Sequence, residues 1–132
     1  MKIPIVTLDT PNKNNRIYPR AVMEKALAKY KKDFIDERRA FVQKQLPGDS
    51  MVSLLDVVGV VKEFIIEGDK VIMDVEFLPN VPDGLRVEEG LKSGKLSLRT
   101  HGIGSMRLQD DGTYIIGEDY EFISCFATDD PA

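Results

Sequence analysis

The stretch "LLDVVGVVKEFIIEGDKVIMDVEFL", residues 54–78, carries the clearest strand signal in this chain of 132 residues. Two runs rich in Val and Ile flank "EGD" at 67–69, which is the pattern of a β-hairpin closed by a glycine-containing loop. Further strand-like runs occupy 3–8, 39–46, 95–108, 113–117 and 120–128, and "PGDS" at 47–50 and "QDDG" at 109–112 are turn clusters. We therefore expect a fold dominated by β-strands.

The segment "NKNNRIYPRAVMEKAL", residues 12–27, leads into the longest helical pattern. Its polar run is either a binding loop for an acidic partner or a turn that starts a helix. Asn tolerates left-handed backbone and bonds locally, so the turn is favoured. Pro19 suits the first helical position because its φ is fixed and its missing N–H is not needed there. From about Pro19 to Arg38, apolar residues recur at helical spacing: Val22, Ala26, Leu27, Tyr30 and Phe34.

A second, shorter helix is predicted over residues 85–94. Its inward residues are expected to be Leu85, Val87 and Leu91, with Gly94 near its end. No repeat or linker divides the chain. The prediction is a single α+β domain over residues 1–132, a β-rich small barrel-like sheet with one long amphipathic helix and one short helix.

Composition limits the classes of partner. A net charge of −4 argues against a general nucleic-acid binder. The basic run "KYKK" at 29–32 is expected to be a solvated helix face, with a polyanion site as the alternative. No apolar stretch approaches the roughly 20 residues that span a membrane. The short apolar start lacks a signal-peptide cleavage site, so we expect a cytoplasmic protein without a membrane partner.

Residues that could carry chemistry are few. Cys125 lies in the apolar run "FISCF", which indicates a buried structural thiol, and no Cys/His cluster has metal-ligand spacing, so neither a metal nor a cofactor is expected. The single histidine, His101, shares a strand face with Ser97, but about 13 Å separates them along a strand. A local Ser–His pair is therefore not expected, and His101 is interpreted as a partly exposed residue at a strand end.

Several stretches, in their order along the chain, resemble a known family. They are "NKNNRIYPRAVMEKAL", "VQKQLP", "VVKEFIIEGDKVIMDVEFLP", "GLKSGKLSLRTHGIGS" and "ISCFATDDPA". Together, over roughly residues 11–132, they resemble the prohead (capsid maturation) proteases of tailed phages. Those are serine proteases that share an ancestral fold with herpesvirus assemblins.

The resemblance also indicates which positions would carry the base and the orienting acid. The family run Gly-Glu-Leu-x-His-Pro aligns with residues 42–47, which places Leu46 where the family has its general base. A second family histidine falls at Gly59, and the Asp near the C-terminus falls at Phe126. Leu cannot accept a proton and Phe cannot orient an imidazole.

The nucleophile motif departs from the family in the same direction. The family pattern Gly-x-Ser-Ser-Arg-Gly-x-Gly-Ser, anchored on "GIGS" at 102–105, places Ser97 at the leading Gly. Arg99 and Thr100 then stand at the two serines, and His101 stands at the Arg. Arg cannot attack a carbonyl. The resemblance therefore implies a protease scaffold whose triad positions are Leu46, Arg99, Thr100 and Phe126, with no catalytic residue expected.

Three functions remain open from the sequence. The first is a catalytically inactive prohead-protease-like protein that binds phage head or scaffold proteins, or regulates an active protease relative. The second is an active, divergent serine or threonine endopeptidase that cleaves scaffold or capsid proteins with Ser97, Thr100 and His101. The third is a small phage protein that engages a host factor through residues 29–32. The family resemblance further implies a place in the host cytoplasm, in or near the procapsid, and homo-oligomers.

Overall fold

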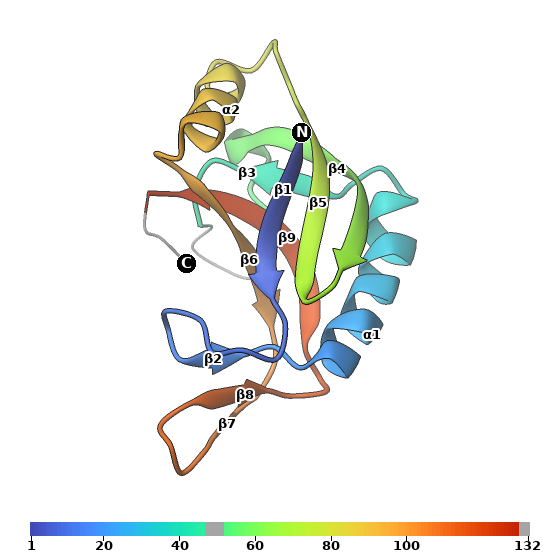
Figure 1. Cartoon of the computed structure of the whole chain (residues 1–132). Coiled ribbons are helices and arrows are strands. Elements are labelled where there is room, and N and C mark those ends of the chain that lie inside the picture. Colours follow the sequence, from blue (N-terminus) through green and yellow to red (C-terminus); the bar gives the residue numbers. More distant parts are fainter. Residues whose placement is uncertain (47–51, 130–132) are drawn as a thin grey trace.

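The computed structural model describes residues 1–46 and 52–129, so the turn predicted at 47–50 lies outside the described residues. Six strands form one sheet that curls into a half-barrel, in the order β1-β5-β4-β3-β9-β6 (Figure 1). Their bounds are Lys2–Thr7 (β1), Phe41–Gln43 (β3), Val57–Glu67 (β4), Lys70–Phe77 (β5), Ser97–Ile103 (β6) and Glu121–Thr128 (β9). The predicted α+β class and barrel-like sheet are confirmed.

The hairpin predicted from residues 54–78 is β4 and β5. The strands pair antiparallel from Gly59 opposite Phe77 to Glu67 opposite Lys70, and Gly68 adopts a φ of +62° in the turn. Residues 54–56 differ from the prediction, because Leu54–Asp56 forms a 3₁₀ turn closed by a hydrogen bond from the Asp56 N–H to the Ser53 carbonyl. Both leucines of that turn are exposed, since no strand covers them there.

The long helix α1 spans Arg20–Tyr30 and continues as a π-helical segment, Lys31–Ile35. It begins one residue later than predicted, because Pro19 has extended backbone and is the N-cap. The Arg20 N–H donates instead to Oδ1 of Asp9, so a side chain from the preceding loop caps the helix. The predicted helical region therefore exists, with a different first residue.

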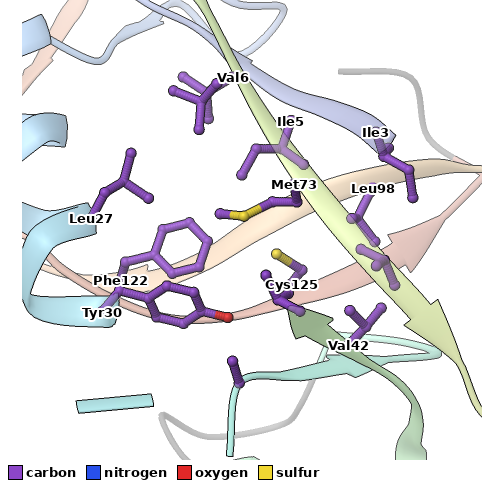
Figure 2. Packing of buried hydrophobic residues seen from close by; sticks show 14 of the residues in the cluster. Ile3, Ile5, Val6, Leu27, Tyr30, Val42, Met73, Leu98, Phe122 and Cys125 are labelled. Atoms are coloured by element: carbon purple, nitrogen blue, oxygen red, sulfur yellow. The ribbon is translucent and has the colours of Figure 1, made fainter. Parts of the chain in front are cut away.

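The hydrophobic core fills the inside of the half-barrel between the sheet and α1. Figure 2 shows Leu27 and Tyr30 of α1 packed with side chains from five strands. Those strand residues are Ile3, Ile5 and Val6 (β1), Val42 (β3), Met73 (β5), Leu98 (β6), Phe122 and Cys125 (β9). Cys125 is buried as predicted. Burial of this cluster anchors the helix to the sheet.

The short helix α2 spans Gly84–Ser93 and ends at Gly94, whose φ is +79°, as predicted. Val87 is buried and Leu91 packs against the core, but the inward orientation predicted for Leu85 is wrong because that residue is 56% exposed. Residues two apart point to different sides of a helix, so Leu85 and Val87 cannot share one face. The predicted strand 39–46 is also shorter, since β3 covers only Phe41–Gln43.

Three short strands form a second sheet below the half-barrel (Figure 1). Its order is β2-β8-β7, with bounds Arg16–Ile17 (β2), Met106–Leu108 (β7) and Tyr114–Ile116 (β8). Within the large sheet, β1 and β6 are the two edges, and the curl brings them close to each other. The seam between these edges positions the candidate site.

Candidate active-site cleft

A cleft of about 720 Å³ opens along the seam between β1 and β6. We call it the seam cleft. Residues 4–7 of β1 and the turn that contains Asn12 and Arg16 form one part of its lining. Residues 99–102 of β6, Phe126 of β9, Leu46 and Lys70 form another part. Segments from six regions of the chain therefore meet at this one place.

The four positions aligned with the family triad all line the seam cleft. They are Leu46, Arg99, Thr100 and Phe126. Arg99 stands directly opposite Phe126 in the antiparallel ladder of β6 and β9, and Phe126 is paired on its other side with Gln43 of β3. The fold brings these positions together although they are spread over 80 residues of sequence.

Thr100 and His101 are neighbours in sequence but point to opposite faces of β6. Strand alternation places the Thr100 side chain on the face of Leu98, which is buried in the core. Arg99 and His101 share the other face. A nucleophile and its base must lie within hydrogen-bond reach, so this geometry does not pair the Thr100 hydroxyl with the His101 ring.

His101 is more buried than the sequence predicted. It is only 8% exposed and lies inside β6, opposite Ser124 of β9, so the expectation of a partly exposed strand end is wrong. Its Nδ1 lies 3.1 Å from the Ser124 Oγ. Ser97 lies opposite Thr128 at the other end of β6 and is not part of the cleft lining. Ser97 and His101 are thus not brought together.

A buried polar network that sequence reasoning missed lies behind His101. The Gln43 Nε2 donates to the Ser124 Oγ over 3.0 Å, and the Ser53 N–H donates to the Gln43 Oε1 over 2.8 Å. Gln43 and Ser124 are both fully buried. A nucleophilic hydroxyl has to reach the substrate, so the burial of Ser124 argues against that role for it. Only strand register brings these residues together, and no sequence motif signals it.

Two further positions, Gly59 and Cys125, lie in closely packed surroundings. A Cβ at Gly59, where the family has a histidine, would lie 3.0 Å from the carbonyl oxygen of Glu76. Burial raises the pKa of the Cys125 thiol to about 12, so the reactive thiolate is absent near neutral pH. Among the described residues, no group of three or more His, Cys, Asp or Glu side chains could hold a metal ion.

The buried thiol makes stability depend on pH at the alkaline end. Its folded pKa of about 12 lies above the ordinary value of 9.0, so the unfolded chain loses this proton first. The stabilising contribution is complete below pH 9 and is lost as the pH rises, by up to about 1.4 kcal/mol per pH unit. Urea unfolding between pH 8 and pH 10.5 should show a smaller alkaline loss for Cys125→Ala than for the wild type. Parallel curves for the two proteins would contradict the burial of this thiol.

The seam cleft is rich in positive charge although the chain is acidic overall. Lys13, Arg16, Lys70 and Arg99 line it, and none of its described lining residues is Asp or Glu. Lys70 Nζ donates to the Thr7 Oγ1 over 2.9 Å. Lys13, Arg16 and Lys70 belong to none of the ion pairs formed among residues 1–46 and 52–129. The cleft therefore suits an anionic ligand.

A second hollow of about 770 Å³ beside α2 provides a contrast. Three cations and two carboxylates line it, and two of the cations, Lys44 and Arg86, form ion pairs with Asp83 at 2.9 and 2.6 Å. The hydrogen bond from Lys44 lowers the pKa of that carboxyl group. Both hollows are concave, so shape alone does not distinguish the seam cleft from the hollow beside α2. The difference lies in Lys13, Arg16 and Lys70, which line the seam cleft and belong to no ion pair formed among residues 1–46 and 52–129.

The segment of residues 12–16 is a tight turn and also lines the cleft, although the sequence analysis treated a turn and a binding loop as alternatives. Asn12 Oδ1 accepts hydrogen bonds from the N–H groups of Asn14 and Arg16, and Asn15 has a φ of +59°, which confirms the predicted turn. The same turn supplies Lys13 and Arg16 to the cleft. A tight turn and a site for an acidic ligand are therefore compatible here.

Two lysines of the basic run at 29–32 form ion pairs with carboxylates of neighbouring strands. Lys29 Nζ lies 2.9 Å from Glu121 Oε1, and Lys31 Nζ lies 2.9 Å from Glu63 Oε2. These hydrogen bonds raise the pKa of both lysines. The lysines thus join the helix to β9 and β4, an arrangement that weakens the case for a polyanion site at 29–32. No helix in the part of the chain that the structure describes could cross a membrane.

Residues 5–129 match the family model described as prohead core protein serine protease. The chain belongs to this family. Among solved structures, the chain is similar to the capsid assembly protease gp21 of bacteriophage T4, with a TM-score of 0.87 and 18% identity over 96% of this chain and 79% of that chain. At this identity the likeness shows the fold alone. No curated protein matches the chain.

Proposed function

We propose that this prohead-protease family member is catalytically inactive and acts in the assembly of a phage head. It binds an extended segment of a head or scaffold protein in the seam cleft, or it regulates an active relative in the same way. The observation that carries this proposal is the lining of the cleft at the aligned triad positions. Leu46 and Phe126 offer neither a base nor an acid there, and Arg99 offers no nucleophile.

The alternative of an active, divergent endopeptidase is less well supported. Such an enzyme needs a nucleophile, a base and a group that orients the base. Thr100 points away from His101, Ser97 lies outside the cleft lining, and the hydroxyl that does approach His101 belongs to the inaccessible Ser124. Of these three hydroxyls, that of Thr100 lacks a base within reach, that of Ser97 lies outside the cleft lining, and that of Ser124 is not accessible to a substrate.

Binding can persist without catalysis because the shape of the cleft is retained. It is bounded by two sheet edges, and sheet edges bind extended peptides through main-chain hydrogen bonds. The positive charges of Lys13, Arg16 and Lys70 favour an acidic segment over a neutral or basic one. We therefore expect the bound segment to be extended and acidic.

The test is an incubation of the purified chain with scaffold and capsid proteins from the same phage, with an active prohead protease as the positive control. We expect saturable binding without new fragments, and an intact mass that stays constant over days. Ser97→Ala, at a residue outside the cleft lining, should bind as the wild type does, and Thr100→Ala should likewise give no new fragments. Cleavage by the wild type that either substitution abolishes would overturn the proposal.

A further inference from the structure

The hairpin formed by β7 and β8 exposes apolar side chains away from the seam cleft. Three large hydrophobic residues of the hairpin are accessible: Met106 45%, Leu108 61% and Tyr114 37%. Ile103, at the end of β6, is also 46% exposed. None of them lines the seam cleft. Figure 1 shows this hairpin projecting from the half-barrel at the end opposite α2. Exposed apolar groups gathered on one projection are typical of interaction surfaces.

Strand register sorts the hairpin side chains into two faces. Leu108 lies opposite Tyr114 and Met106 lies opposite Ile116, so these four share one face. Ile116 is buried, which anchors the base of this face, whereas Leu108 and Tyr114 extend beyond the anchored part. Arg107 lies on the other face, opposite Ile115. We call Met106, Leu108 and Tyr114 the hairpin apolar face.

Hydrogen bonds hold the hairpin rigid at both ends. At the tip, Asp111 Oδ1 accepts from the N–H and the hydroxyl of Thr113, at 3.0 and 2.6 Å. At the base, Asp119 accepts from the N–H and the hydroxyl of Ser105, and these bonds lower the pKa of Asp119. A preorganised surface gives up little conformational freedom when a partner binds. The exposed apolar face is therefore fixed in position before any partner arrives.

The backbone of β7 points to the form of the partner. β7 is an edge of the three-stranded sheet, so one side of its backbone faces no strand of the described chain. Such an edge pairs with an extended strand of another chain unless it is protected. All three residues of β7 are exposed, and two of the three are large and apolar. The surface therefore suits an added strand.

Charge disfavours a second copy of this chain as that strand. An antiparallel pair of β7 strands that overlaps all three residues would place Arg107 directly opposite the Arg107 of the other copy. Like charges in that position are destabilising. An acidic residue opposite Arg107 is instead favourable, and Arg107 belongs to no ion pair formed among the described residues.

We propose that β7 and the hairpin apolar face bind an extended segment of a different protein, one in which an acidic residue stands between two apolar residues. The segment adds a strand to the small sheet. Its acidic side chain lies opposite Arg107, and its apolar side chains lie beside Met106 and Leu108. This surface is a second docking site, independent of the ligand proposed for the seam cleft.

The test uses the full chain and three synthetic nine-residue peptides with identical flanks. Their central residues are Val-Glu-Val, Val-Lys-Val and Ser-Glu-Ser, and binding is followed by amide chemical shifts. We expect the Val-Glu-Val peptide to bind about threefold to tenfold more tightly than either other peptide. The shift changes should centre on residues 105–108, and Arg107→Glu should reverse the preference between Glu and Lys. Leu108→Asn should weaken binding of the Val-Glu-Val peptide.

Lys13→Glu separates this site from the seam cleft. If it leaves the Glu preference unchanged, the preference belongs to β7. If it abolishes the preference while Arg107→Glu does not, the peptide occupies the cleft and the proposal for β7 fails. Equal binding of all three peptides, or no binding at millimolar concentration, also overturns it. So does a dimer in sedimentation that Leu108→Asn disperses, because a second copy then covers the face.

Discussion

Reversing the three cleft charges, with Lys13→Glu, Arg16→Glu and Lys70→Glu in one variant, is expected to weaken binding of a glutamate-rich extended peptide about 100-fold. Each substitution replaces an attraction by a repulsion, and an exposed pair contributes about 0.2–1 kcal/mol. Three reversals therefore amount to about 3 kcal/mol, and each 1.4 kcal/mol is about tenfold in affinity. Titration calorimetry at two ionic strengths measures the change. The affinity of the wild type should fall with added salt, since exposed charges are screened.

A matched control keeps the change in net charge but leaves the cleft intact. Lys2, Lys25 and Lys32 are exposed and do not line the cleft, so the same three-fold substitution to Glu at these positions tests the general field of the protein. We expect this control to retain most of the affinity. An equal loss in both variants would show that the peptide responds to net charge and not to the cleft. Circular dichroism of the single variant Lys13→Glu shows whether the protein still folds, and so distinguishes a loss of peptide binding from a loss of folding.

The positive charge of the cleft and the side chains at the aligned triad positions belong to the same lining. An active triad places a carboxylate and an imidazole in the cleft, whereas here Leu46 and Phe126 occupy those aligned positions and Arg99 adds a cation. None of the described lining residues is a carboxylate, and Lys13, Arg16 and Lys70 belong to none of the ion pairs formed among residues 1–46 and 52–129. A lining without a carboxylate favours an acidic ligand more strongly than a lining that holds one.

Local patterns predicted the elements of this fold, whereas the site depended on register. The hairpin of residues 54–78 was evident because its β-branched runs and its glycine turn are adjacent in sequence. The pairing of His101 with Ser124 was not evident, because it depends on how β6 and β9 align. A shift of one residue in that alignment would place both side chains on other faces.

The same reason explains why the charge of the cleft escaped the sequence analysis. Its cations come from the turn at 12–16, the start of β5 and the middle of β6, and no short motif contains them all. The family resemblance aligned Leu46, Arg99, Thr100 and Phe126 with the triad positions. All four line the seam cleft, and their relation to a catalytic triad stays a prediction. The inward orientation predicted for Leu85 was wrong because Leu85 lies two residues from the buried Val87 and so points to another side of α2.

Tyr30 is expected to give the largest stability effect of a single substitution. It is 1% exposed, and its ring lies 4.5 Å from that of Phe122 and 5.4 Å from that of Phe34, measured between centroids. Tyr30→Ala should lower the free energy of unfolding by about 3–5 kcal/mol, as for other large aromatic truncations. Urea denaturation followed by circular dichroism measures this loss. The cause is the contact between α1 and β9, which seals one side of the core.

Tyr30→Phe is the informative partner of that substitution. The Tyr30 hydroxyl is buried and has no hydrogen-bond partner among the described residues, an arrangement that costs about 1–3 kcal/mol. Removing only this oxygen keeps both ring contacts, so Tyr30→Phe should be neutral or stabilising. Burial also raises the pKa of Tyr30, so the substitution should lessen the loss of stability above pH 10, where the unfolded phenol ionises first. Tyr114→Phe, at a partly exposed ring, should change neither quantity. A destabilisation by Tyr30→Phe of more than about 1 kcal/mol would mean that the hydroxyl makes a hydrogen bond in the folded protein.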